Sequence, residues 1–167
     1  MRRLAPVIVV FCFALWLGGL SALMLFVQTL FKQDRASAVI VAPQLFHAFE
    51  PYALGCALVG FWTTVFWALG TRSRHVLLVL IFLGVALSLL LTSFGFITPN
   101  VEQTRGTPAF GRWHGASNLT YLVQMFMVVM AGLALPGAIR STMSPRRTTA
   151  GVAPALIPPA EADRPET

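Results

Sequence analysis

The sequence predicts an all-α membrane protein, a polytopic bundle of four transmembrane helices that cross the bilayer up-down-up-down. Of its 167 residues, 56% are hydrophobic and only 11% are charged, whereas an ordinary soluble domain has about 25% charged residues. Four stretches, each 21 residues or longer, have no charged side chain: 4–31, 51–71, 76–101 and 113–139. A helix rises about 1.5 Å per residue and the hydrocarbon core is about 30 Å thick, so each stretch can cross it.

The alternation of apolar and polar residues that marks a membrane β-barrel is missing from these stretches, so helices are the expected spanning elements. The low charge content excludes a soluble globular enzyme and a disordered chain. The net charge is +6, but the arginines flank the apolar stretches and form no basic face. We therefore expect the lipid bilayer, and no nucleic acid, as a partner.

The first expected span covers about residues 5–31. It follows Met1-Arg2-Arg3, which also resembles the start of a secretory signal, but it stays apolar to Phe31. The apolar core of a signal is only about 7–15 residues long, so we expect a retained helix. Ala14, Gly18 and Ala22 recur at every fourth position and predict a packing seam, because small residues let helices approach closely in lipid.

The first outer loop, residues 32–50, predicts a short interfacial or re-entrant helix. Val39, Ala42, Phe46 and Phe49 would share one face of that helix. Proline suits a first helical position, so we expect the segment to restart at Pro43 and the second span to begin at Pro51.

The second and third spans are expected at about 51–70 and 76–98. Their connection is so short that they form a tight antiparallel hairpin. Gly84 and Ser88 predict a second packing seam on the third span. The fourth span is expected at about 112–138, which completes a membrane domain of residues 1–142. The remaining segment, 143–167, has five prolines and mixed charges, and predicts a disordered cytoplasmic tail.

The distribution of lysine and arginine predicts the orientation. Seven such residues near the membrane lie on the side of both termini: Arg2, Arg3, Arg72, Arg74, Arg140, Arg146 and Arg147. Four lie on the other side: Lys32, Arg35, Arg105 and Arg112. Positive residues stay cytoplasmic, so we expect a protein of the inner (cytoplasmic) membrane with both termini inside.

Motifs for catalysis are missing from the sequence. It has no HExxH or CxxC pattern, no phosphate-binding loop and no nucleophile elbow. None of the four uncharged stretches has an ionisable acid or base near its middle, which counts against an active transporter. We therefore expect no catalytic residue, no cofactor, no metal site and no enzymatic activity.

One group of polar residues stands out at the outer face: His47, Glu50, Arg112, His114 and Ser117. The simplest interpretation is a membrane-interface belt, with the arginine reaching toward water. Two alternatives are a metal or haem held by His47 and His114, and a small polar ligand.

The same group predicts a cap on the outer end of the bundle. Arg112 would lie in the first turn of its helix, where the helix dipole disfavours a cation. We expect Glu50 or Glu102 to pair with it. Arg112 and His114 would then fold against residues 44–50, with His47 facing His114.

Several short motifs resemble a known family. They are Trp16-Leu17-Gly18-Gly19, Leu45-Phe46, Gly55-Cys56-Ala57, Pro99 and Phe110-x-x-x-His114-Gly115-x-Ser117. The chain resembles, from about Leu15 to Ala134, the small four-helix membrane proteins of unknown function related to transmembrane protein 205. It departs from them at His47-Ala48-Phe49 and at Tyr121. The resemblance implies the fold and the membrane location, and no catalytic residue or cofactor.

These observations predict a non-enzymatic integral membrane protein that packs with partners or with copies of itself. The first alternative is a small transporter or channel subunit that acts as an oligomer. The second is a haem- or metal-binding membrane redox protein.

Overall fold

The computed structural model describes residues 4–143, which are helical apart from short turns. The elements are α1 (Leu4–Gln33), α2 (Arg35–Thr71), α3 (Arg74–Thr92), the π-helix η1 (Ser93–Ile97), α4 (Thr98–Gln103) and α5 (Phe110–Met143). Four helical segments are long and apolar enough to cross a membrane: α1, α2, the continuous stretch from α3 through α4, and α5. The all-helical fold is confirmed, and the segments are consistent with a multi-pass membrane protein. The predicted disordered tail lies outside the described residues, except for Met143, which ends α5.

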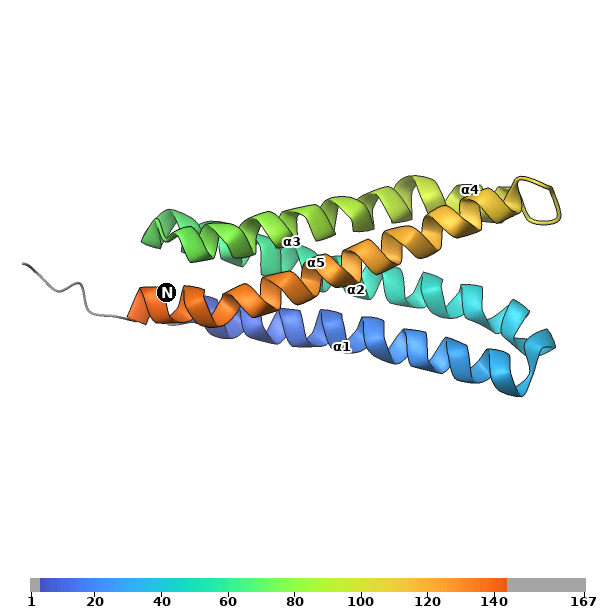
Figure 1. Cartoon of the computed structure of the whole chain (residues 1–167), viewed down its shortest axis with the longest axis horizontal. Helices are drawn as coiled ribbons and strands as arrows, with labels where there is room; N and C mark the ends of the chain where they lie inside the picture. Colours follow the sequence, from blue (N-terminus) through green and yellow to red (C-terminus); the bar gives the residue numbers. More distant parts are fainter. Residues whose placement is uncertain (1–3, 144–167) are drawn as a thin grey trace, which may run out of the picture.

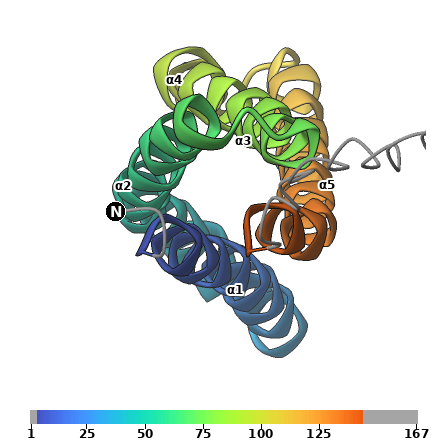
Figure 2. The same cartoon turned by 90° about the vertical axis from the view of Figure 1, so that its left-hand side faces the viewer.

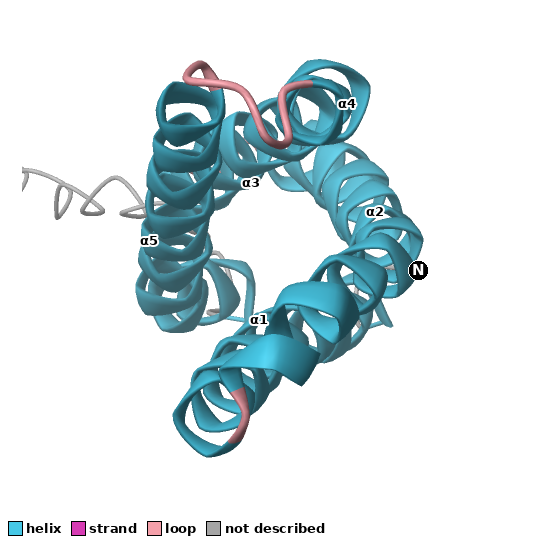
Figure 3. Cartoon of the chain, turned by 90° about the vertical axis from the view of Figure 1, so that its right-hand side faces the viewer, coloured by secondary structure: helices cyan, strands magenta, loops and turns pink. Residues whose placement is uncertain are grey.

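The helices lie side by side in a ring whose order is α1, α2, α3 and α5 (Figure 2). The chain turns at Asp34 and at residues 104–109, which lie at one end, and at residues 72–73 at the opposite end (Figure 1). α1 packs mainly on α2, and α3 on α5, whereas the contact between α1 and α5 is much less extensive. At the end that contains Asp34, the α1–α2 pair diverges from the α4–α5 pair (Figures 1 and 3).

The interior of the bundle is apolar over most of its length. Its largest wholly buried side chain is Trp16, and Val76, Val128 and Ala131 are also fully enclosed. Many large apolar side chains point outward, as suits a surface in contact with lipid. Small residues bring helices together: a β-carbon on Gly132 would lie 2.2 Å from the ring of Phe13.

The segment before the second predicted span differs from the expectation. A separate interfacial helix is not formed, because α2 runs without a break from Arg35 to Thr71 through Pro43 and Pro51. Each proline removes one backbone hydrogen bond, but packing on α1 holds the segment helical. The buried residues of the segment are Ala38, Ala42 and Glu50, whereas Val39, predicted to share a face with Ala42, is 56% exposed.

The predicted packing seams are only partly inside the bundle. Ala14, Gly18 and Ala22 are exposed, and a β-carbon on Gly18 would meet nothing within 4 Å. Gly84 does lie at a helix contact, because a β-carbon added there would lie 3.3 Å from the ring of Phe61. Ser88 is exposed and donates its hydroxyl proton to the Gly84 carbonyl.

Asp34 forms the turn between α1 and α2. Its carboxylate accepts hydrogen bonds from the backbone N–H groups of Ala36 and Ser37, at 3.0 and 3.3 Å. It also accepts one from the Ser37 hydroxyl. These bonds, above all that from the Ser37 hydroxyl, lower the pKa of Asp34 below its ordinary value of 3.8. Asp34 is therefore the N-cap of α2.

Candidate functional site

Glu50 lies inside the bundle, so its predicted position on the outer face is wrong. Its side chain is only 2% exposed. Glu50 shares one face of α2 with Ala42, Phe46, Ala53 and Ala57, because α2 continues through Pro51. The Oγ1 hydroxyl of Thr98 donates a 2.8 Å hydrogen bond to Oε1 of Glu50.

The π-helix η1 positions the partner of Glu50. The backbone N–H of Thr98 bonds to the carbonyl of Ser93, five residues earlier. A π turn places residues five apart above one another, so Ser93 and Thr98 lie on the same side. Ser93 is fully buried, and its hydroxyl has no hydrogen-bond partner among the described residues. Such turns occur often at functional sites.

Helix α5 contributes two more buried polar side chains, Tyr121 and Gln124, spaced three residues apart on one face. The ring of Tyr121 packs on Phe46, with 5.3 Å between centroids. Tyr121 also lies close enough to Glu50 for the two side chains to interact electrostatically. Within residues 4–143, the Tyr121 hydroxyl and both polar atoms of the wholly buried Gln124 make no hydrogen bond of accepted geometry.

We use the name interior polar cluster for Glu50, the two residues beside it, Thr98 and Tyr121, and two buried polar residues further along the same helical segments, Ser93 and Gln124. It comes from three helical segments that are far apart in the sequence. On α1, Gly19 lies opposite Phe49 and Tyr52. From Gly19 to Phe31, which lies about 18 Å further along the helix, α1 has no charged residue.

Glu50 has no cationic partner in the part of the chain that is described. The single ion pair found between residues 4 and 143 joins His47 to Glu102 at the surface. No three His, Cys, Asp or Glu side chains in this range gather closely enough to hold a metal ion. A ligand of the cluster would therefore contact one carboxylate and otherwise neutral groups.

The predicted outer-face group is only partly brought together. His47 contacts Glu102 on α4, and each of these side chains is about half exposed. His114 is exposed and stacks on Phe110 of its own helix, with 5.4 Å between ring centroids. Arg112 is exposed and forms no ion pair with Glu50 or Glu102. Ser117 is half-buried, one turn inward from His114.

At the end of the bundle predicted to face outward, the two helix pairs are thus connected by contacts other than those predicted. Residues 46–50 of α2 do pack on the second helix pair, but through Glu102, Thr98 and Tyr121. His47 bonds to Glu102 and His114 stacks on Phe110, and no hydrogen bond joins the two histidines within residues 4–143.

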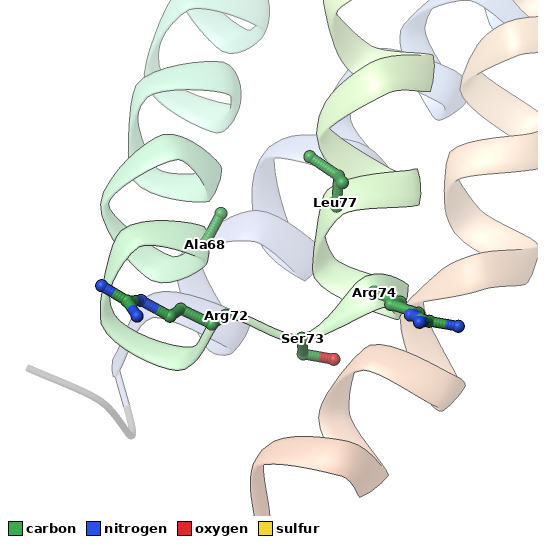
Figure 4. A pocket seen from close by; sticks show the side chains of 5 residues that line it. All are labelled: Ala68, Arg72, Ser73, Arg74 and Leu77. Atoms are coloured by element: carbon green, nitrogen blue, oxygen red, sulfur yellow. The ribbon is translucent and has the colours of Figure 1, made fainter.

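A shallow hollow of about 160 Å³ lies at the opposite end, beside the α2–α3 turn (Figure 4). Ala68 and Leu77 form its apolar wall, and Arg72 and Arg74 extend to opposite sides of it (Figure 4). Arg72 ends α2 in a left-handed conformation with φ of 49°. Because the two guanidinium groups diverge, they do not converge on one ligand, and the hollow is a weaker candidate than the interior polar cluster.

Comparisons of the chain with models of protein families, with curated proteins and with solved structures gave no match. The resemblance to proteins related to transmembrane protein 205 therefore stays a prediction.

One signal in the sequence could have revealed the buried position of Glu50. Ala42, Phe46, Glu50, Ala53 and Ala57 follow helical spacing across Pro51. A helix boundary predicted at each proline separates Glu50 from the apolar face to which it belongs. The π turn has no comparable signature in the sequence.

Proposed function

We propose that this protein is a non-enzymatic, multi-pass component of the cytoplasmic membrane whose four helices cross up-down-up-down, with both termini inside. The proposal is supported by four apolar helices joined by short turns. It is also supported by the excess of lysine and arginine on the side of the termini.

Reporter fusions test this topology. A phosphatase active only outside and a fluorescent protein active only inside are fused in turn after Arg35, Arg72, Arg105 and Arg147. We expect the fusions at Arg72 and Arg147 to be inside and the other two outside. An outside signal at Arg72 would reverse the orientation, and the same side for Arg35 and Arg72 would reject the up-down crossing.

The proposed role is association with a second copy of the chain through α1. The observation that supports it is the exposed row of Ala14, Gly18 and Ala22, which no other helix within residues 4–143 covers. In lipid, apolar surface by itself does not drive association, and small residues permit the close backbone contact that does. The same row on a second copy would be complementary, as in a two-fold dimer.

A pair of matched variants tests this association. Gly18→Leu adds a large side chain to the row, whereas Gly55→Leu adds it on α2. Both glycines are exposed, and a β-carbon at either position meets nothing within 4 Å, so the two changes are matched in their surroundings within one chain. We expect only Gly18→Leu to lower the dimer fraction, measured by energy transfer between labelled copies in vesicles. Equal loss in both variants, or a wild type that stays monomeric at every density, would contradict the proposal.

The alternative, a small transporter or channel subunit, is favoured by one observation. Glu50 is an ionisable side chain inside the bundle, and such residues often line ion or substrate pathways. The test is ion flux into vesicles that contain the protein. Flux that is abolished by Glu50→Gln and retained by Glu102→Gln would favour this alternative.

A further inference from the structure

The end of the bundle beside the α2–α3 turn has an unbalanced positive charge. Arg72 ends α2, Arg74 begins α3, and Arg140 lies in the last turn of α5. The Ser73 and Ser141 hydroxyls, 2.7 Å apart, connect the turn to α5 and so place Arg140 beside it. All three arginines are exposed, and none has an ion pair within residues 4–143. We call these arginines, together with the hollow between α2 and α3, the basic surface (Figure 4).

The carboxylates that could balance this charge lie elsewhere. Between residues 4 and 143 they are Asp34, Glu50 and Glu102. Asp34 lies at the opposite end of the bundle (Figure 1), and Glu102 is bound to His47. Glu50 is separated from Arg72 by about 33 Å of helix, which is about three times the Debye length at 0.1 M salt. No carboxylate of this range therefore neutralises the arginines, and their counter-charge comes from outside it.

The hollow combines the positive charge with an apolar wall on the outside of the bundle. Ala68 and Leu77 form the wall, and Leu77 is 51% exposed. Their neighbours in the sequence, Leu69 and Leu78, are also exposed. The hollow measures about 160 Å³, whereas sites for small soluble ligands measure about 300–1,000 Å³. A soluble anion would contact the arginines and leave this apolar wall uncovered.

The direction of the arginines indicates what kind of anion fits. Arg72 and Arg74 extend to opposite sides of the hollow, so no single phosphate group contacts both (Figure 4). A lipid leaflet offers several phosphate groups along one surface, with acyl chains beside them. Each guanidinium can then bind a phosphate of its own, for which its planar set of donors is well suited. The divergence that excludes one small ligand is therefore compatible with a membrane surface.

We propose that the basic surface binds the headgroups of anionic phospholipids, with an acyl chain of one bound lipid on the wall of Ala68 and Leu77. Basic residues at the ends of membrane helices attract anionic lipids, and each strengthens binding about fivefold. The start of α3 adds the positive end of a helix dipole, which the Ser73 side chain leaves uncapped.

This inference goes beyond self-association through α1, because binding of lipid at the α2–α3 turn requires no second copy. It also holds for either orientation of the bundle in the membrane. Failure of lipid binding and failure of the proposed function are therefore distinguishable.

The test uses the full-length protein in a neutral detergent. It is titrated with an equimolar mixture of phosphatidylglycerol, which is anionic, and phosphatidylcholine, which has no net charge, both with the same acyl chains. Native mass spectrometry counts the lipids of each kind that stay bound. We expect the wild type to retain phosphatidylglycerol in preference, and Arg74→Gln to lower this preference about fivefold. A wild type that retains both lipids equally would overturn the proposal.

Arg112→Gln is the matched control. It removes the same charge from an exposed arginine at the start of α5, which lies at the opposite end of the bundle. Because Asp34 and Glu102 supply negative charge at that end, we expect this variant to keep nearly the full preference. Circular dichroism checks that both variants keep their helices. An equal loss in Arg74→Gln and Arg112→Gln would mean that the lipids do not recognise the basic surface.

A soluble anion is tested as the first competing occupant. Glycerol 3-phosphate has the phosphate group of the lipid and no acyl chain. We expect millimolar glycerol 3-phosphate to leave the bound phosphatidylglycerol in place. Displacement would assign the basic surface to a soluble phosphate and would overturn the lipid proposal.

The remaining carboxylates of the chain are tested as the second competing occupant. They belong to Glu161, Asp163 and Glu166, and the variant Glu161→Gln/Asp163→Asn/Glu166→Gln removes their charge. We expect it to bind phosphatidylglycerol as the wild type does. If its binding rises, and the rise is lost when Arg72 and Arg74 are also replaced by glutamine, these carboxylates occupy the basic surface and the proposal is wrong.

Discussion

Thr98 donates a 2.8 Å hydrogen bond from its Oγ1 hydroxyl to Oε1 of Glu50, and so connects the α1–α2 pair to the α3–α5 pair. It depends on the π turn of η1, which sets the direction of Thr98, and on the continuity of α2 through Pro51.

Loss of this bond should destabilise the bundle. Thr98→Val keeps the shape of the side chain and leaves a buried carboxylate oxygen without its donor, at a cost of about 1–3 kcal/mol. The control is Thr92→Val, because Thr92 is exposed and bonds only to the Ser88 carbonyl of its own helix. Unfolding in detergent, followed by circular dichroism, measures both. Equal effects of the two substitutions would contradict the role given to Thr98.

The surface pair of His47 and Glu102 should contribute much less. Both side chains are about half exposed, and such pairs contribute about 0–1 kcal/mol. A double-mutant cycle with His47→Ala and Glu102→Gln measures the coupling free energy. A coupling above about 2 kcal/mol would mean that the pair is a main connection between the helix pairs.

Gly132 should not tolerate a methyl group. In Gly132→Ala the added carbon would lie 2.2 Å from the ring of Phe13, so α5 and α1 would have to separate or the ring would have to move. Overpacking of this kind costs about 1–3 kcal/mol. Gly115→Ala meets nothing within 4 Å and should be neutral or stabilising, because alanine favours a helix. A drop in Tm for Gly115→Ala as large as for Gly132→Ala would refute this contact.

Asp34 should make the start of α2 sensitive to acid. Its pKa is lowered by hydrogen bonds from Ser37 and Ala36, so the charged form is the one that stabilises the folded helix. This contribution is complete above about pH 5, and it is lost as the pH falls below 3.8 and through the lowered pKa. Near neutral pH, Asp34→Ala should speed amide hydrogen exchange at Ala36 and Ser37. Asp34→Asn should retain most of the protection, because asparagine also caps helices.

The main elements could be predicted from composition and charge because each depends on local sequence. Long uncharged stretches must form helices in lipid, and the short connection at residues 72–73 permits only a tight turn. Of the candidate site, the sequence identified Glu50 and His47 as residues of interest but paired them wrongly. Glu102, named only as a partner for Arg112, is the residue that His47 contacts.

The sequence by itself determined that this is an all-helical chain with four segments able to span a membrane, because hydropathy and length act over contiguous residues. Only the tertiary structure decided that Glu50 is buried and that a π turn brings Ser93 and Thr98 to one side of their helix. It also decided that Gly18 is exposed, whereas Gly132 packs against another helix. Each depends on which helix lies opposite which, and on whether a helix continues through a proline. Those outcomes follow from the packing of distant segments, since a proline removes the same hydrogen bond whether or not a neighbouring helix holds the segment in place.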